Sequence, residues 1–87
     1  MSWGLNIDST VSRQLRELDV ATQERVLDAL EAACADPMGF PVECGEGLYE
    51  VTVPDVADSS YVSLTLTLDT PRQMLKVVGL RVLRDDG

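Results

Sequence analysis

Residues 61–69 show the clearest hydrophobic pattern in the chain. Every second position is apolar there: Val62, Leu64, Leu66 and Leu68. The positions between them carry hydroxyl groups: Tyr61, Ser63, Thr65 and Thr67. A period of two, rich in β-branched and aromatic residues, predicts a half-buried β-strand. We therefore expect one face of this strand to pack against a core and the other to present polar groups.

Two further runs with strand character flank residues 61–69. Residues 48–53 alternate before it and stop at Pro54, and residues 73–83 follow a tight turn at Asp69-Thr70-Pro71. The last run is apolar on both faces, which favours a central or well-covered strand. By simple alternation one of its faces carries Leu75, Val77, Gly79, Arg81 and Leu83. Short connections between three strands predict an antiparallel meander.

The first twenty residues predict a short strand and a helix. Residues 3–7 alternate between apolar and small or polar residues, as in a strand. Apolar residues then recur with helical spacing, at Val11, Leu15 and Leu18. Asp8 or Ser9 can cap the N-terminus of this helix, because their side-chain oxygens accept hydrogen bonds from its free amides.

A second amphipathic helix is predicted from Asp19, its cap, to about Ala35. Asp36-Pro37 ends it, since the residue before proline avoids the α region. Residues 36–47 hold two prolines and three glycines and are predicted as a loop. The order is thus β-α-α-β-β-β. It predicts an α+β fold with an antiparallel sheet and a helical hairpin packed on one face.

The 87 residues fit a single domain, 1–87. No apolar run reaches the roughly eighteen residues of a membrane span, and no signal peptide is evident at the N-terminus. We therefore expect a cytoplasmic protein without a membrane partner. Cys34 and Cys44 form no Cys-x-x-Cys pair, and the chain has no histidine. We expect reduced thiols, no metal site and no other cofactor.

The net charge is −8, and its distribution along the chain is uneven. No lysine or arginine occurs between Arg25 and Arg72. That interval holds nine acids: Asp28, Glu31, Asp36, Glu43, Glu46, Glu50, Asp55, Asp58 and Asp69. Proteins that bind free nucleic acid through phosphate contacts normally display a basic face. This composition predicts a surface that repels free nucleic acid over most of its area.

Three segments together resemble the RelE/ParE superfamily of toxins from type II toxin–antitoxin systems. Residues 30–37, Leu-Glu-Ala-Ala-Cys-Ala-Asp-Pro, are similar to the end of the family's second helix. Residues 47–53, Gly-Leu-Tyr-Glu-Val-Thr-Val, are similar to its Gly-Leu-Tyr-Glu-Leu-Arg-Val strand. Residues 61–69 and 77–84 are similar to its last two strands. The resemblance implies a toxin held by a cognate antitoxin protein, acting on mRNA at the ribosome or on DNA gyrase.

The RelE-like reaction is the cleavage of mRNA by an endoribonuclease on the open face of the sheet. It needs a group to take the proton of the ribose 2′-hydroxyl, one to stabilise charge on the phosphorane, and one to protonate the leaving oxygen. By resemblance, the candidate catalytic residues are Arg81, Arg84 and Tyr61. Arg81 and Arg84 lie on opposite faces by alternation, so only one of them can share a cleft with Tyr61.

Each candidate also has a structural reading. Tyr61 could be a strand-end aromatic residue, and Arg81 could pair with Glu50. The family's arginine in the first strand of the meander is replaced by Thr52. A second arginine should fall near Val62 or Ser63, neither of which is basic. Whether the chain is an enzyme therefore stays open. The alternatives are a weakened relative of the nuclease, a non-catalytic protein-interaction module of the same fold, and a ParE-like gyrase inhibitor.

Overall fold

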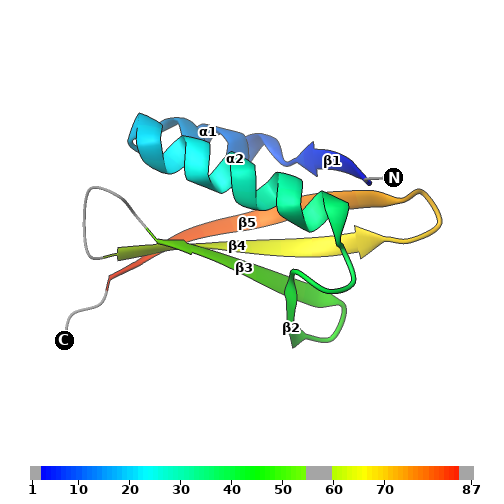
Figure 1. The fold of residues 1–87 in the computed structure, drawn as a ribbon. Helices are drawn as coiled ribbons and strands as arrows, with labels where there is room; N and C mark the ends of the chain where they lie inside the picture. Colours follow the sequence, from blue (N-terminus) through cyan, green and yellow to red (C-terminus); the bar gives the residue numbers. More distant parts are fainter. Residues whose placement is uncertain (1–2, 55–59, 85–87) are drawn as a thin grey trace.

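The structure, a computed structural model, describes residues 3–54 and 60–84 of the chain. Two helices cover one face of a five-stranded sheet, and the other face is open (Figure 1). The elements in chain order are β1 (Gly4–Ile7), α1 (Ser9–Arg16), α2 (Val20–Ala35), β2 (Val42–Gly45), β3 (Leu48–Pro54), β4 (Ser60–Asp69) and β5 (Met74–Arg84). The α+β class and the helical hairpin on one face are confirmed.

The strand order across the sheet is β1-β5-β4-β3-β2. The meander predicted from the sequence is confirmed, since β3, β4 and β5 pair antiparallel in succession. The first strand departs from the expected antiparallel sheet. It pairs parallel with β5, with Gly4 opposite Met74 and Ile7 opposite Val77. The helical hairpin and the other strands lie between β1 and β5 in the chain, so a tight turn does not constrain their relative direction.

Residues 42–45 form a strand, so the prediction of a loop throughout residues 36–47 is wrong. Val42 pairs with Glu50 and Glu43 with Tyr49, which makes β2 the outer strand of a hairpin. Gly47 closes the turn with φ +74°, a conformation that glycine adopts without steric cost. Pairing with β3 thus overrides a glycine- and proline-rich composition that by itself favours a loop.

The core lies between the helices and the sheet, with α1 packed on β5 and α2 on β3. The alternation in residues 61–69 predicts the inward face correctly, because Val62, Leu64 and Leu66 are completely buried. They pack with residues from both helices and from the neighbouring strands: Val11, Val26, Leu30, Ala33, Val51, Val53, Leu75, Val77 and Leu80. The apolar stripes of the helices therefore meet the apolar face of the sheet, as their spacing predicts.

A β-bulge at Val78 corrects the faces expected for the last strand. Thr65 pairs with Gly79 and Leu66 with Val77, so Val78 has no partner in β4. The extra residue reverses the alternation of everything that follows it. Leu75 and Val77 consequently share the core face with Leu80, not with Arg81, which is exposed. The expected set of residues 75, 77, 79, 81 and 83 on one face is wrong.

The sequence left Asp8 or Ser9 as the cap of the first helix and predicted Asp19 for the second; the N-caps are Asp8 and Asp19, but only Asp19 makes a side-chain cap. Asp8 occupies the N-cap of α1 without a side-chain hydrogen bond. Asp19 accepts hydrogen bonds from the backbone N–H and the hydroxyl of Thr22, both at 3.4 Å.

Within the described residues, no helix is long and apolar enough to cross a membrane.

Cys34 joins the end of α2 to the start of the chain. Its carbonyl accepts a hydrogen bond of 2.9 Å from the backbone N–H of Trp3, and its thiol donates to the carbonyl of Gly4 at 3.9 Å. Cys34 is buried, as expected for a small core residue, and burial raises the pKa of its thiol, with a further contribution from the Glu31 carboxylate. Cys44 is exposed, and both cysteines are free thiols.

Candidate functional site

The face of the sheet that the helices leave uncovered is called the open face below. The register of β3, β4 and β5 places on it Glu50, Thr52, Pro54, Tyr61, Ser63, Thr65, Thr67, Lys76, Gly79, Arg81 and Leu83. In Figure 1 it is the lower side of the long strands. Most of these side chains are exposed or half-buried and can reach a ligand without displacing a helix, so the open face is the candidate functional surface.

Tyr61 and Arg81, two of the three candidates, lie close together on the open face. Tyr61 is opposite Leu83 in β5, and Arg81 is opposite Ser63 in β4, so the two are diagonal neighbours on adjacent strands. Diagonal neighbours of this kind are about 7–8 Å apart, within reach of aromatic and long side chains. Both side chains are exposed, Tyr61 by 43%. A phosphate or a peptide group on this surface can therefore contact both.

Arg84 occupies a different register position, opposite Ser60 at the end of β5. The spacing of three residues between Arg81 and Arg84 is maintained after the bulge, as the sequence alternation expects. The register brings Tyr61 and Arg81 together on the open face, and it places Arg84 at the end of the strand. Among the three candidates, the site therefore rests on Tyr61 and Arg81.

The centre of the open face is neutral. Thr52, Ser63 and Arg81 form a row across three strands, with Ser63 opposite both of the others. The sequence left Val62 and Ser63 as alternatives for a missing basic residue. Val62 is completely buried in the core, so of the two alternatives only Ser63 lies on the open face, where the basic residue was expected. The two positions that lack the family's arginines are thus direct neighbours, and Ser63 is itself only 3% exposed.

The ion pairs lie at the far end of β4 from Tyr61. Asp69 contacts Arg72 at 3.8 Å and Lys76 at 3.9 Å. The expected pair between Arg81 and Glu50 is not formed. Glu50 instead accepts a hydrogen bond of 3.1 Å from the hydroxyl of Thr52. None of the ion pairs between described residues includes Arg81, so its guanidinium is available to an anionic ligand.

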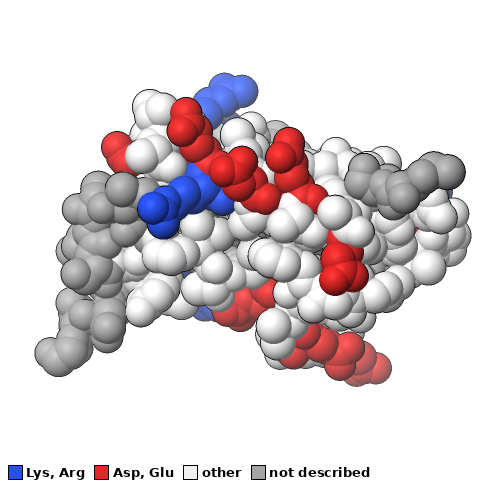
Figure 2. Space-filling view, in the orientation of Figure 1, with Lys and Arg blue, Asp and Glu red and all other residues white. Residues whose placement is uncertain are grey.

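The fold places most of the basic residues and many of the acidic residues on different elements. All cations except Arg25 lie in α1, in β5 or in the turn before β5: Arg13, Arg16, Arg72, Lys76, Arg81 and Arg84. The second half of α2 and the β2–β3 hairpin carry acids and no cation. Acidic side chains run along the helical layer and gather again near β2 (Figure 2). A molecule of net charge −8 thus has its few cations around one side of the sheet.

Neither a metal nor a charge cluster defines the site. Within residues 3–54 and 60–84, no group of three or more histidine, cysteine, aspartate or glutamate side chains could hold a metal ion. A hollow of about 480 Å³ lies between the end of α1 and β5, and Arg81 contributes to its lining with Glu17 and Leu18. The open face carries the Arg81 guanidinium, the Lys76 ammonium group, the Glu50 carboxylate, the Tyr61 phenol and several hydroxyl groups.

The sequence interpretation missed the bulge that sets the face of Arg81. Gly79 is the signal that could have found it, because a glycine inside a strand pattern often marks a bulge. The sequence left open whether Arg81 or Arg84 shares the face of Tyr61, and the register after the bulge places Arg81 there. The burial of Ser63 had no signal in the sequence.

Comparison with solved structures identifies the fold. The chain is similar to the isolated E. coli RelE toxin, with a TM-score of 0.77 at 12% identity over 99% of this chain and 88% of that one. A chain of the toxin–antitoxin complex RelBE2 from Mycobacterium tuberculosis gives a TM-score of 0.79 at 12% identity, over 99% and 95%. A chain of the archaeal RelE–RelB complex from Pyrococcus horikoshii gives 0.63 at 16% identity, over all of both chains.

No protein-family model matches the sequence, and no curated protein matches it. The likeness is therefore structural, extends over nearly the whole chain, and agrees with the three sequence segments that resemble the superfamily. The chain has the fold of the RelE toxins.

Proposed function

We propose that this protein is the toxin of a type II toxin–antitoxin system and that a cognate antitoxin protein holds it. The observation that carries the proposal is the RelE fold over 99% of the chain, combined with an open sheet face that no described helix covers. RelE of E. coli and the P. horikoshii protein are each found in a complex with RelB. An antitoxin segment that folds on binding can cover such a face.

We propose further that the effector activity is ribosome-dependent cleavage of mRNA, in a weakened form. Arg81 can stabilise the charge that develops on the phosphorane, because it is exposed and has no ion pair among the described residues. Tyr61, its diagonal neighbour, can exchange a proton with the ribose hydroxyl or the leaving oxygen. The hydroxyl of Thr65 can donate a hydrogen bond to a phosphate oxygen.

The neutral centre of the open face explains why the activity should be weak. Removing one electrostatic stabiliser typically lowers kcat by about 10²–10³. Here Thr52 and Ser63 both stand where the family pattern has arginine, and they are adjacent. What remains is Arg81, which can supply one charge-assisted contact to the phosphate but not the several that the family uses.

The same observation favours a second candidate, a non-catalytic module that kept the fold for protein binding. A row of Thr52 and Ser63 beside a single arginine suits hydrogen bonds with a partner better than phosphoryl chemistry. A ParE-like gyrase inhibitor is the third alternative, since gyrase inhibition does not need nuclease residues. A DNA supercoiling assay with purified gyrase tests it directly.

Induced expression in a bacterial host tests the toxin proposal. We expect growth arrest when the chain is expressed alone and recovery when the product of the adjacent gene is expressed with it. Arrest with cut mRNA supports the nuclease, and arrest with inhibited supercoiling supports the gyrase alternative. Normal growth, together with no binding of the adjacent gene product, contradicts the toxin proposal. Normal growth with tight binding supports the non-catalytic module.

A further inference from the structure

The outer edge of β3 is only partly covered by β2. The pairing of the two strands ends at Val42 opposite Glu50, whereas β3 continues to Pro54. Among the backbone hydrogen bonds that described residues make outside helices and strands, none reaches Val51–Pro54. An edge of this kind presents backbone N–H and C=O groups that can pair with another extended chain.

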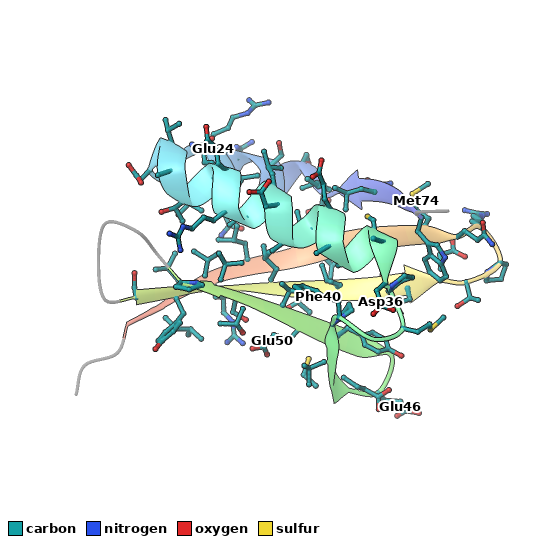
Figure 3. The ribbon with its side chains drawn as sticks, in the orientation of Figure 1. Glu24, Asp36, Phe40, Glu46, Glu50 and Met74 are labelled. Carbon is teal, nitrogen blue, oxygen red and sulfur yellow. The ribbon has the colours of Figure 1, made fainter. Side chains whose placement is uncertain are left out.

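A groove accompanies this free edge. It has a volume of about 420 Å³ and is lined by Phe40, Val42, Cys44, Glu50, Val51 and Thr52. Phe40 is 45% exposed and Val42 69%, so two large apolar side chains stand in solvent at the groove. Figure 3 shows Phe40 and Glu50 near β3 and Glu46 at the tip of the β2–β3 hairpin. The groove thus offers apolar contact area beside an unpaired strand edge.

The charge around the groove has a single sign. Glu50 is part of the lining, Glu43 lies in β2, and Glu46 lies in the turn between β2 and β3. Asp36 ends the helix from which the chain enters this region. No lysine or arginine occurs in the sequence from residue 26 to residue 71, which includes all of β2 and β3. Any occupant of the groove therefore meets a negative surface.

This charge excludes a second copy of the chain as the best occupant. Pairing two β3 edges would bring the glutamates of one hairpin next to those of the other, and like charges on neighbouring strands destabilise a sheet. A segment that carries lysine or arginine is instead attracted by the glutamates of the hairpin. Phe40 and Val42 are exposed and apolar, so an occupant with apolar side chains also gains free energy by covering them.

We propose that this edge binds an extended segment of a partner protein in which apolar residues alternate with lysine or arginine. The segment adds a strand beside Val51–Pro54, in line with β2, and its main chain pairs with β3. Its apolar side chains contact Phe40 and Val42, and a basic side chain pairs with Glu50. Strand addition of this kind takes affinity from main-chain hydrogen bonds and specificity from alternate side chains. The inference does not depend on the toxin activity proposed above.

A display library of random short peptides, selected against the full chain, tests the proposal. We expect enrichment of peptides in which valine, isoleucine or leucine alternates with lysine or arginine. Binding of a synthetic peptide from this set should slow amide hydrogen exchange at those residues of Val51–Val53 whose N–H points away from β4, because successive N–H groups of a strand point to opposite neighbours. Glu50→Lys should weaken its affinity by about tenfold, because the attraction of a basic side chain to a half-buried carboxylate becomes a repulsion. Val42→Asp should weaken it as well.

Glu24→Lys is the matched control, since it makes the same charge change on an exposed position of α2 (Figure 3). It should leave peptide affinity within about twofold, because charges beyond a Debye length of about 10 Å are largely screened. Circular dichroism shows whether each variant is folded. If Glu50→Lys does not fold, Val42→Asp still tests the proposal, because Val42 is strongly exposed and its substitution should not affect folding.

Three results would overturn the proposal. The first is a library that enriches no peptide, or peptides without basic residues. The second is a peptide whose affinity falls equally with Glu24→Lys and Glu50→Lys, which indicates general attraction to an acidic protein. The third is a homodimer in sedimentation experiments that Val42→Asp dissociates, because a second copy then occupies the edge. The growth assay tests the toxin proposal and the peptide affinities test the strand edge, so either proposal can be contradicted without the other.

Discussion

Arg81 of β5 lies opposite Ser63 of β4, on the face of the sheet that the helices leave open. This pair sets the character of the candidate site. Ser63 is buried between Thr52 on one side and Arg81 on the other, so the only cation of the row stands at its outer end. Arg81 is therefore the one cation in a row whose other two members carry hydroxyl groups.

The bulge that places Arg81 there can be tested by removing it. Deletion of Val78 makes Leu66–Val77 and Thr65–Gly79 consecutive pairs of a regular ladder, so Leu75, Val77 and Leu80 keep their places in the core. Deletion of Ser63, in the regular part of β4, instead takes Val62 or Leu64 out of the core, which costs about 1.5–3 kcal/mol. Urea unfolding should therefore show a much larger loss for the Ser63 deletion than for the Val78 deletion. Equal losses for the two deletions would contradict the assigned bulge.

The inward face of β4 predicts a large difference between two leucines. Leu64 is completely buried, whereas Leu27 of α2 is exposed. Leu64→Ala should lower the free energy of unfolding by about 2–5 kcal/mol, the usual range for a buried leucine. Leu27→Ala should change it by less than about 0.5 kcal/mol, because surface substitutions have small effects. Chemical denaturation measures both, and similar losses would show that the packing of the two helices is assigned wrongly.

The two N-cap aspartates should differ as their hydrogen bonds do. Asp19 accepts from Thr22 at 3.4 Å, so Asp19→Ala should cost about 0.5–1 kcal/mol, the lower part of the range for caps. Asp8 makes no side-chain cap, so Asp8→Ala removes only the interaction with the helix dipole, which Asp19→Ala removes in addition to its hydrogen bonds. Thermal unfolding should rank Asp19→Ala as the more damaging change. A larger loss of stability in Asp8→Ala than in Asp19→Ala would contradict the assigned caps.

The two thiols should react with alkylating reagents at very different rates. Burial raises the pKa of Cys34, so the reactive thiolate is rare there at neutral pH, whereas Cys44 is exposed. Mass spectrometry should show Cys44 modified first, and Cys44→Ser should leave only the slow reaction. Comparable rates for both cysteines in the folded protein would contradict the burial of Cys34.

The raised pKa of Cys34 also predicts how stability depends on pH. In the unfolded chain the thiol loses its proton at its ordinary pKa, while the folded state still holds the proton. The unfolded state then binds fewer protons, so the free energy of unfolding falls as pH rises from the ordinary thiol pKa to the raised one. Below the ordinary pKa the contribution is constant. Cys34→Ala should remove this alkaline loss in denaturation series at several pH values.

The sequence predicted the two helices and the three-strand meander because local patterns and packing agree there. The period of two in residues 61–69 correctly predicts that Val62, Leu64 and Leu66 are buried, and the helix bounds follow from Asp19 and Asp36-Pro37. The parallel pairing of β1 with β5 depends on contacts between the two ends of the chain, which no local pattern contains. The same holds for β2, whose pairing with β3 outweighs its loop-like composition.

The candidate site was less predictable, for a physical reason. Alternation assigns a face to each residue only as long as the ladder is regular, and the bulge at Val78 interrupts it ahead of Arg81. The sequence suggested that Arg81 could pair with Glu50, but Glu50 opposes Thr65 on β4 and bonds to Thr52. Register, which decides such contacts, follows from the whole sheet.

Cleavage of mRNA on translating ribosomes, measured with the purified protein, tests the central claim most directly. We predict weak, ribosome-dependent cleavage that Arg81→Ala lowers by about 10²–10³, as expected for the loss of a charge stabiliser. Tyr61→Phe should lower it as well. Arg72→Ala, which removes an equally charged side chain from the turn at the far end of β4, should leave it unchanged. Cleavage that is insensitive to Arg81→Ala, or absent in the wild-type protein, would contradict the proposed nuclease.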